Sequence, residues 1–182
     1  TDFESLNASD PNALSNDGWL IFANVWLADG GYYGYGVFPA PNHDVGFSAI
    51  ATGEGGASQG VQQLVVFSDY ANGDHANNAT IQAIVFQEQI IGPDDVGEVW
   101  VFDFEAKRGN IAGSSVAKAF IKTLDPGAGY AETNFIFEDM TSTPDTWTHY
   151  RLTINIDAGL VGQLLQTGFL NDATLYEGSG VF

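Results

Sequence analysis

Apolar and polar residues alternate along much of this chain. From residue 98 to 107, large apolar side chains alternate with charged ones, and a period of two is typical of a β-strand with one buried face. Residues 147–156 repeat the pattern. The positions expected to face inward are Trp100, Phe102, Phe104, Ala106, Tyr150, Leu152, Ile154 and Ile156. His149 falls on the polar face of its strand, where we expect it to be exposed.

Other apolar runs are short and bounded by turn-forming residues. We expect strands over 18–26, 32–39, 47–52, 62–68, 81–91, 116–124, 134–139, 164–170 and 178–182. Residues 81–91 are apolar on both faces, as in a central strand. The helical signals, at 93–96 and 157–163, are each only one or two turns long. Many strands without intervening helices predict an all-β sandwich or barrel, and we expect one domain over residues 1–182.

Composition narrows the function classes. The chain has 182 residues, 22 glycines and no cysteine, so it can bury a core without disulfides and has no thiolate metal site. Its formal net charge of -18 offers no basic footprint for nucleic acid and disfavours anionic membranes. No apolar run is long enough to span a membrane as a helix. The charge fits either solvation in salty surroundings, as in a marine or halophilic bacterium, or acidic groups gathered to bind cations.

Catalytic signatures are weak. Known nucleophile, phosphate-loop and zinc-helix motifs are absent, and His43 and His75 fall in separate loops without ligand spacing. Asp103 and Glu105 share one strand face, and Glu88 lies in the expected central strand. Glu88 is therefore a candidate catalytic acid, a candidate ligand contact or a partner for Lys107 or Arg108.

Aromatic residues are concentrated between residues 26 and 38, where glycines separate them. Rings of this kind either stack on the C–H faces of sugars or fill the core. A polar loop at 68–78 surrounds one further ring. As a candidate ligand site we therefore expect Trp26, Tyr33 and Tyr35 to form a stacking platform, and Tyr70, His75 and Gln87 to supply polar contacts.

Four segments in order resemble jelly-roll carbohydrate-binding modules of the family 4/9 type. They are Asp2-Phe-Glu-Ser followed by Asp17-Gly-Trp, the strand Val99 to Lys107, the segment Asp145-Thr-Trp-Thr-His-Tyr, and the closing Glu177-Gly-Ser-Gly-Val-Phe. The resemblance implies a jelly-roll β-sandwich with the galactose-binding-like fold. It also implies a structural calcium near the termini, with Glu4 as a ligand and Asp2 nearby.

The resulting hypothesis is a non-catalytic module that binds a polysaccharide, of a neutral glucan type because the chain is so acidic. The resemblance implies a secreted or cell-surface location and an attached catalytic domain in a larger polypeptide, and we expect a monomer. Two alternatives stay open. One is a small jelly-roll glycoside hydrolase or polysaccharide lyase, and the other is a structural or adhesive module without a glycan ligand.

Overall fold

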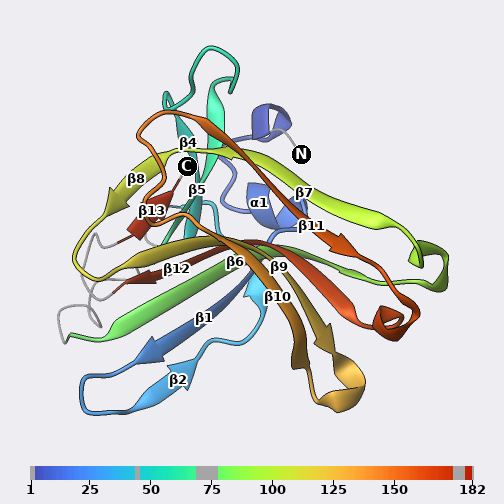
Figure 1. Cartoon of the computed structure of the whole chain (residues 1–182). Helices are drawn as coiled ribbons and strands as arrows, with labels where there is room; N and C mark the ends of the chain where they lie inside the picture. The colour runs from blue at the N-terminus through green and yellow to red at the C-terminus, as the bar shows by residue number, and fades with distance from the viewer. Residues whose placement is uncertain (1–2, 44–45, 69–77, 174–178, 182) are drawn as a thin grey trace.

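The protein is an antiparallel β-sandwich, as the strand pattern predicted (Figure 1). The computed structural model describes residues 3–43, 46–68, 78–173 and 179–181. The first layer is a seven-stranded sheet in the order β10-β9-β12-β6-β1-β2, with β3 also paired to β1. Its strands are β1 (Leu20–Trp26), β2 (Tyr32–Gly34), β3 (Phe38–Pro39), β6 (Thr80–Ile90), β9 (Val116–Asp125), β10 (Ala131–Asp139) and β12 (Leu164–Ala173).

The second layer consists of two smaller sheets. One has the order β4-β5-β13-β8, and the other is the pair β11-β7. Their strands are β4 (Ser48–Thr52), β5 (Gln62–Phe67), β7 (Val99–Ala106), β8 (Arg108–Ile111), β11 (Thr148–Asn155) and β13 (Ser179–Val181). Helical turns are short: α1 (Ala13–Asn16), η1 (Phe3–Ser5), η2 (Pro93–Asp95), η3 (Pro126–Ala128) and η4 (Ala158–Leu160). Among the described residues, no helix is long and apolar enough to cross a membrane.

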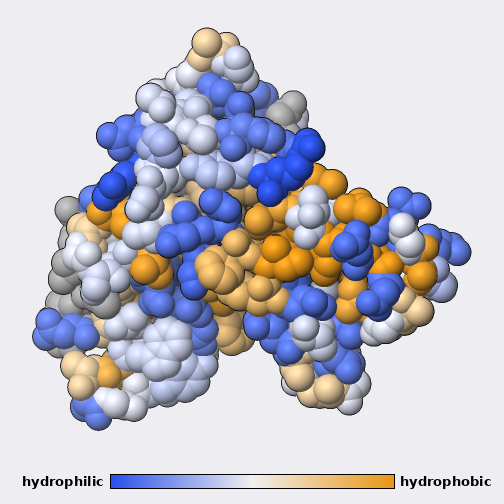
Figure 2. Space-filling view, viewed as in Figure 1, coloured by the Kyte–Doolittle hydropathy of each residue, from blue (hydrophilic) through white to orange (hydrophobic). Residues whose placement is uncertain are grey.

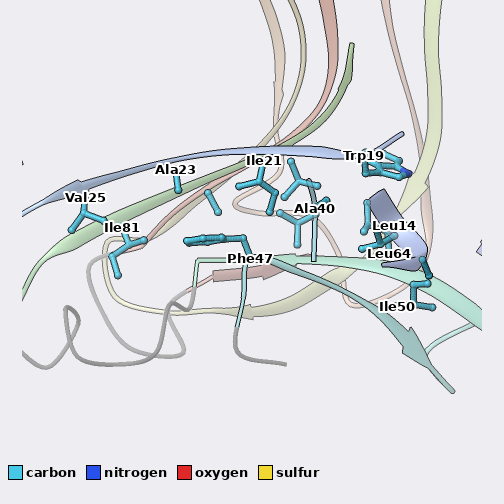
Figure 3. Close-up of a cluster of buried hydrophobic side chains, with 14 of the residues drawn as sticks. Leu14, Trp19, Ile21, Ala23, Val25, Ala40, Phe47, Ile50, Leu64 and Ile81 are labelled. Carbon is cyan, nitrogen blue, oxygen red and sulfur yellow. The ribbon is translucent and has the colours of Figure 1, made fainter. Parts of the chain in front are cut away.

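The main core lies between the two layers. Under β4 and β5 the first layer contributes Ile21, Ala23, Val25 and Ile81, which pack with Phe47 and Leu64 (Figure 3). Under β7 and β11 it contributes Ala117, Ala119, Ile121 and Leu165. The inward orientation predicted for Trp100, Phe102 and Phe104 is confirmed, since all three pack against this second cluster.

Several local expectations are corrected. Residues 32–39 form two short strands rather than one segment, because Gly36 takes a φ of 67° between them. Strand β8 was not predicted, since Arg-Gly-Asn resembles a turn, but it continues the direction of β7 and pairs with β13. Lys107 was one of the two residues expected to pair with Glu88. Its Nζ instead forms an ion pair with Glu54 Oε2 at 2.7 Å.

A third apolar cluster lies on the opposite face of the seven-stranded sheet. Ile84, Phe86 and Phe120 are buried there and pack with Leu20, Phe22, Phe135 and Leu170. The arms β1-β2 and β9-β10 bend away from the central strands on this side (Figure 1). The curvature therefore buries the middle of a face that the second layer does not cover.

Gly168 lies at the point of closest backbone approach in this curved region. It is paired with Phe86 and Phe120, and a Cβ there would lie 2.1 Å from the backbone oxygen of Val85. A separation this short cannot be relieved by a side-chain rotation, because the atom it meets is backbone. Only glycine fits at this position of the β12–β6 pairing.

We predict that Gly168→Ala destabilises the fold by about 3 kcal/mol or more, since overpacking against backbone has no inexpensive relief. Gly92→Ala is the matched control, because its Cβ would meet only the Asp95 carboxylate at 3.4 Å. Urea unfolding followed by tryptophan fluorescence measures both. Equal midpoints for the two variants would contradict the assigned close approach.

Candidate functional site

The outer face of the seven-stranded sheet, which is the face turned away from the second layer, carries a row of polar side chains. Cross-strand partners point to the same face of a sheet. Asn24 is paired with Gly34 and Gln82, and Gln82 is paired with Asp172. The side chains of Asn24, Gln82 and Asp172 therefore stand side by side across β1, β6 and β12.

Hydrogen bonds join this row into one network. The Tyr32 hydroxyl donates to Asn24 Oδ1 at 2.7 Å, and Asn24 Nδ2 donates to Gln82 Oε1 at 2.8 Å. Gln82 in turn hydrogen-bonds the Asp172 carboxyl. Each amide is fixed in orientation by a neighbour, so the row presents donors and acceptors at defined positions.

Two aromatic rings flank the network at its β1-β2 end. Trp26 is paired with Tyr32, and their ring centroids lie 5.9 Å apart with the planes tilted by 39°. Trp26 is 39% exposed and Tyr32 58% exposed. Large rings that stay open to solvent beside fixed amides provide both an apolar platform and polar contacts.

A second polar group lies farther along the same face. Gln166 Nε2 donates to Glu88 Oε2 at 2.7 Å, and Lys122 is the cross-strand partner of Gln166. Burial lowers the pKa of Lys122, while the negative charges of Glu132 and Glu88 oppose that effect. Between this group and the Asn24 row lie the rings and aliphatic side chains of the third apolar cluster. The molecular surface is notched between its two lower lobes (Figure 2).

Asp172 is a half-buried acid on the outer face. Burial raises its pKa, while the Gln82 hydrogen bond and the Lys118 charge act in the opposite direction. Its Oδ1 is buried and has no hydrogen-bond partner within the described part of the chain. Perturbed carboxyl groups concentrate at functional sites, although structural networks also produce them.

The carboxylates suggested by sequence are in different surroundings. Asp103 Oδ1 lies 2.6 Å from His149 Nε2, and Asp103 also binds Arg151. The hydrogen bonds from His149 and Arg151 lower the pKa of Asp103 and so favour its ionised form. Glu105 accepts a hydrogen bond from Gln59 Nε2 at 2.6 Å. An Asp103 held in its charged form is poorly suited to act as a general acid.

A cleft of about 630 Å³ opens on the other side of the sheet, between β5 and β7. Its aromatic lining comes from both layers and from the N-terminal segment: Phe3, Trp19, Phe102, Phe104, Trp147 and Phe169. Gln87 lines this cleft and donates from Nε2 to the backbone oxygen of Asp17 at 3.1 Å. The cleft and the outer face are separate surfaces, because they lie on opposite faces of the seven-stranded sheet.

The structure separates the residues expected to form one platform. Trp26 lies on the outer face, whereas Tyr33 and Tyr35 pack on the other side against the core. The ring centroids of Tyr35 and Phe47 are 6.0 Å apart. Gln87 lies in the cleft. Tyr70 and His75 lie outside the described residues. Trp26, Tyr33, Tyr35 and Gln87 therefore do not converge, and Trp26 stands instead beside Tyr32.

Four residues of this face were not predicted as site residues from the sequence: Tyr32, Asn24, Gln82 and Asp172. A weak signal was present, because Asn24 and Gln82 are polar positions inside otherwise apolar strands. Asp172 gave no such signal, because the strand expected from the sequence ended at residue 170. In the structure β12 continues to Ala173. The register between strands brings these residues together, and no local pattern reports it.

Glu4, the expected calcium ligand, accepts hydrogen bonds from two backbone N–H groups. Its Oε1 lies 2.7 Å from the Val61 nitrogen and 2.5 Å from the Gln62 nitrogen. Gly60 leaves room for this carboxylate, because a Cβ there would approach Glu4 Oε1 to 2.6 Å. Asp2 lies outside the described residues, and the described residues contain no cluster of three or more metal-binding side chains. Glu4 thus anchors the N-terminal segment to β5, and calcium binding stays a prediction.

One structural match supports the fold. No protein-family model matches the sequence, and no curated protein matches it. The enzymatically active domain of tailspike protein 4 from bacteriophage CBA120 matches in structure with a TM-score of 0.53 and 13% identity. That match covers 97% of this chain and 20% of the tailspike chain, so this chain spans about a fifth of its length. At this identity the likeness supports the fold alone.

Two weaker structural matches are to modules of Clostridium thermocellum xylanase 10B. The C-terminal family 22 carbohydrate-binding module has a TM-score of 0.39 and 15% identity, covering 75% of this chain and 76% of the module. The N-terminal family 22 and catalytic modules, complexed with xylohexaose, have a TM-score of 0.41 and 12% identity. That second match covers 91% of this chain and 26% of the xylanase chain. None of these three matches is of the family 4/9 type, which stays a prediction.

We predict that Asp172→Asn stabilises the fold at pH 7. A raised carboxyl pKa means that the folded state holds the proton more tightly than the unfolded chain does. Its stabilising effect is present at low pH and is lost as pH rises through the unfolded pKa toward the folded one. The neutral amide should therefore raise the urea midpoint at pH 7 and change it little at about pH 3.

Asp139→Asn is the control with the opposite sign. Hydrogen bonds from Thr141 lower the pKa of Asp139, so its carboxylate stabilises the fold above its unfolded pKa, and the amide should lower the midpoint at pH 7. Shifts of the same sign in both variants would contradict these pKa directions.

For calcium, we predict that a chelator lowers the melting temperature and that added calcium restores it, because a ligand of the native state stabilises by mass action. Glu4→Gln should abolish the calcium response. Magnesium at the same concentration controls for ionic strength. A melting temperature that is the same under all these conditions would contradict calcium binding. The role of Glu4 would then be limited to its hydrogen bonds with the backbone of Val61 and Gln62.

Proposed function

We propose that this protein binds a neutral polysaccharide along the outer face of the seven-stranded sheet, without cleaving it. The observation that carries the proposal is the exposed Trp26–Tyr32 ring pair beside the fixed row of Asn24, Gln82 and Asp172. A pyranose ring has apolar C–H faces and an equatorial rim of hydroxyls. Stacked rings next to oriented amides and a carboxyl match both surfaces at once.

The charges on this face favour a neutral ligand. Lys118 lies near Asp139 and Asp172, and Lys122 lies near Glu88 and Glu132. Each cation is therefore offset by acids within the protein and is not left to attract an anionic sugar. The formal net charge of -18 adds a long-range repulsion of polyanions at low salt. A neutral glucan is the ligand class that we test first.

The spacing of Asp172 and Glu88 argues against hydrolysis by this pair. Asp172 is level with Gln82, and Glu88 lies six residues farther along β6. At a rise of about 3.3 Å per strand residue, the two carboxyls are roughly 20 Å apart. Glycoside hydrolases need two carboxyls within about 5 to 9.5 Å across the scissile bond. The Asp172–Glu88 pair does not have this geometry.

The proposal includes where the protein acts and whether it is attached to a catalytic domain. A polysaccharide-binding surface is useful where polysaccharides occur, which favours a secreted or cell-surface protein. A module without chemistry of its own gains from attachment to a catalytic domain, because tethering raises the effective concentration of enzyme on its substrate. We propose both on this reasoning.

The test is Trp26→Ala measured by calorimetry against soluble β-glucan and xylan oligosaccharides, with polygalacturonate as the anionic comparison. We expect the unaltered protein to bind a neutral glycan with a Kd of roughly μM to mM. Removing the exposed ring should weaken binding by about 30-fold, corresponding to about 2 kcal/mol, while the melting temperature changes little.

Tyr130→Ala is the matched control. Tyr130 is 62% exposed but lies at the turn between β9 and β10, away from the ring pair, so its removal should leave affinity unchanged. Gln82→Ala should weaken binding by breaking the network that orients Asn24. Glycan affinity that survives both Trp26→Ala and Gln82→Ala would exclude this face as the binding surface. Release of reducing ends from any substrate would contradict the non-catalytic role.

A further inference from the structure

A second pair of aromatic rings lies on the β10 arm of the outer face. Phe137 is paired with Phe120, a residue of the third apolar cluster, so its side chain points to the outer face. The ring centroids of Phe135 and Phe137 lie 5.4 Å apart with the planes tilted by 29°, and Phe137 is 46% exposed. The Phe135 ring contacts buried Phe120, with centroids 5.9 Å apart. An exposed ring supported by packed neighbours is a preorganised platform for an apolar ligand surface.

Lys118 connects this ring pair to the polar row. Its Nζ lies 4.6 Å from the centroid of the Phe137 ring. Lys118 is also the cross-strand partner of Asp139 on β10, and its charge acts on Asp172 at the end of the polar row. The row of polar side chains therefore continues beyond Asp172, over Lys118, to the rings on β10.

The resulting band has aromatic rings at both ends. It crosses the sheet from β2 to β10, which are the first and last strands of the path β10-β9-β12-β6-β1-β2 and form separate arms in Figure 1. Trp26 on β1 and Phe137 on β10 are four strand spacings apart, roughly 19 Å. The cross-strand row of Phe137 meets β1 at Leu20, six residues before Trp26, which adds an offset of roughly 20 Å along the strands. Curvature shortens this span, but a ligand that touches both ends still has to be several sugars long.

We propose that the outer face binds an extended internal segment of a polysaccharide that bridges the Trp26–Tyr32 and Phe135–Phe137 ring pairs. The inference rests on the glycan binding proposed above and specifies the form of the ligand. Partly exposed apolar side chains of the third cluster lie between the two ring pairs and can contact the C–H faces of the sugars. Because the band reaches a margin of the sheet at each end, the polymer can continue past both, and no chain terminus has to be bound.

The test is calorimetry with a trisaccharide and a hexasaccharide of β-glucan, and with the matching pair from xylan. The unaltered protein should bind the hexasaccharide at least about tenfold more tightly, because only the longer ligand reaches both ring pairs and the second contact forms within the complex. Phe137→Ala should weaken hexasaccharide binding by about tenfold and trisaccharide binding by less than about twofold. Phe137→Tyr keeps the ring and should keep the hexasaccharide affinity. Tyr130→Ala removes an exposed ring at the turn of the same hairpin and should change neither affinity.

Backbone amide NMR signals of β10 provide a measurement that needs no substitution. They should shift on addition of the hexasaccharide and stay in place with the trisaccharide. If Trp26→Ala weakens the binding of both ligands and Phe137→Ala weakens neither, bridging is overturned and glycan binding stands with one ring pair. Shifts of equal size with both ligands also overturn bridging. If the unaltered protein binds none of the oligosaccharides, both this inference and the proposed function are overturned.

Discussion

The curvature of the seven-stranded sheet is the constraint on which the rest of the structure depends. The middle of its central strands is apolar on both faces, but the second layer covers only one of these faces. The sheet buries the middle of its other face by bending, so that Phe86 and Phe120 are 1% and 0% exposed without a covering layer. Gly168 permits the bend, because any side chain there would collide with the backbone of β6.

The same bend creates the candidate binding surface. A flat sheet would expose a continuous apolar face, which is an aggregation hazard, whereas the curved sheet leaves rings and amides accessible only toward its margins. Trp26 and Tyr32 lie at one margin, next to the row that ends at Asp172. Burial raises the pKa of Asp172 because it stands where the exposed margin meets the buried centre. The proposed binding chemistry therefore follows from the position of the polar row relative to the curve.

The second layer contributes in a different way. Because β7 and β11 form a separate pair, their sheet contacts the first layer through Phe102, Phe104 and Tyr150 rather than through a continuous ladder with β5. Glu4 joins the N-terminal segment to Val61, just before β5. The loop before β5 is held by Glu54, which contacts both Lys107 and Trp147. The outer face and the cleft between β5 and β7 lie on opposite sides of the seven-stranded sheet.

The sequence by itself determined the class of fold and the buried faces of its strands. Period two at Trp100, Phe102 and Phe104 and at Leu152 and Ile154 reports burial through local chemistry, and the structure agrees. Only the tertiary structure decided the site. Tyr33 and Trp26 are neighbours in a glycine-rich aromatic segment, yet they point to opposite faces, whereas Asn24, Gln82 and Asp172 come from three distant segments. Periodicity predicts whether a side chain is buried. Cross-strand register and sheet curvature determine which side chains are its neighbours, and both depend on contacts between residues far apart in the chain.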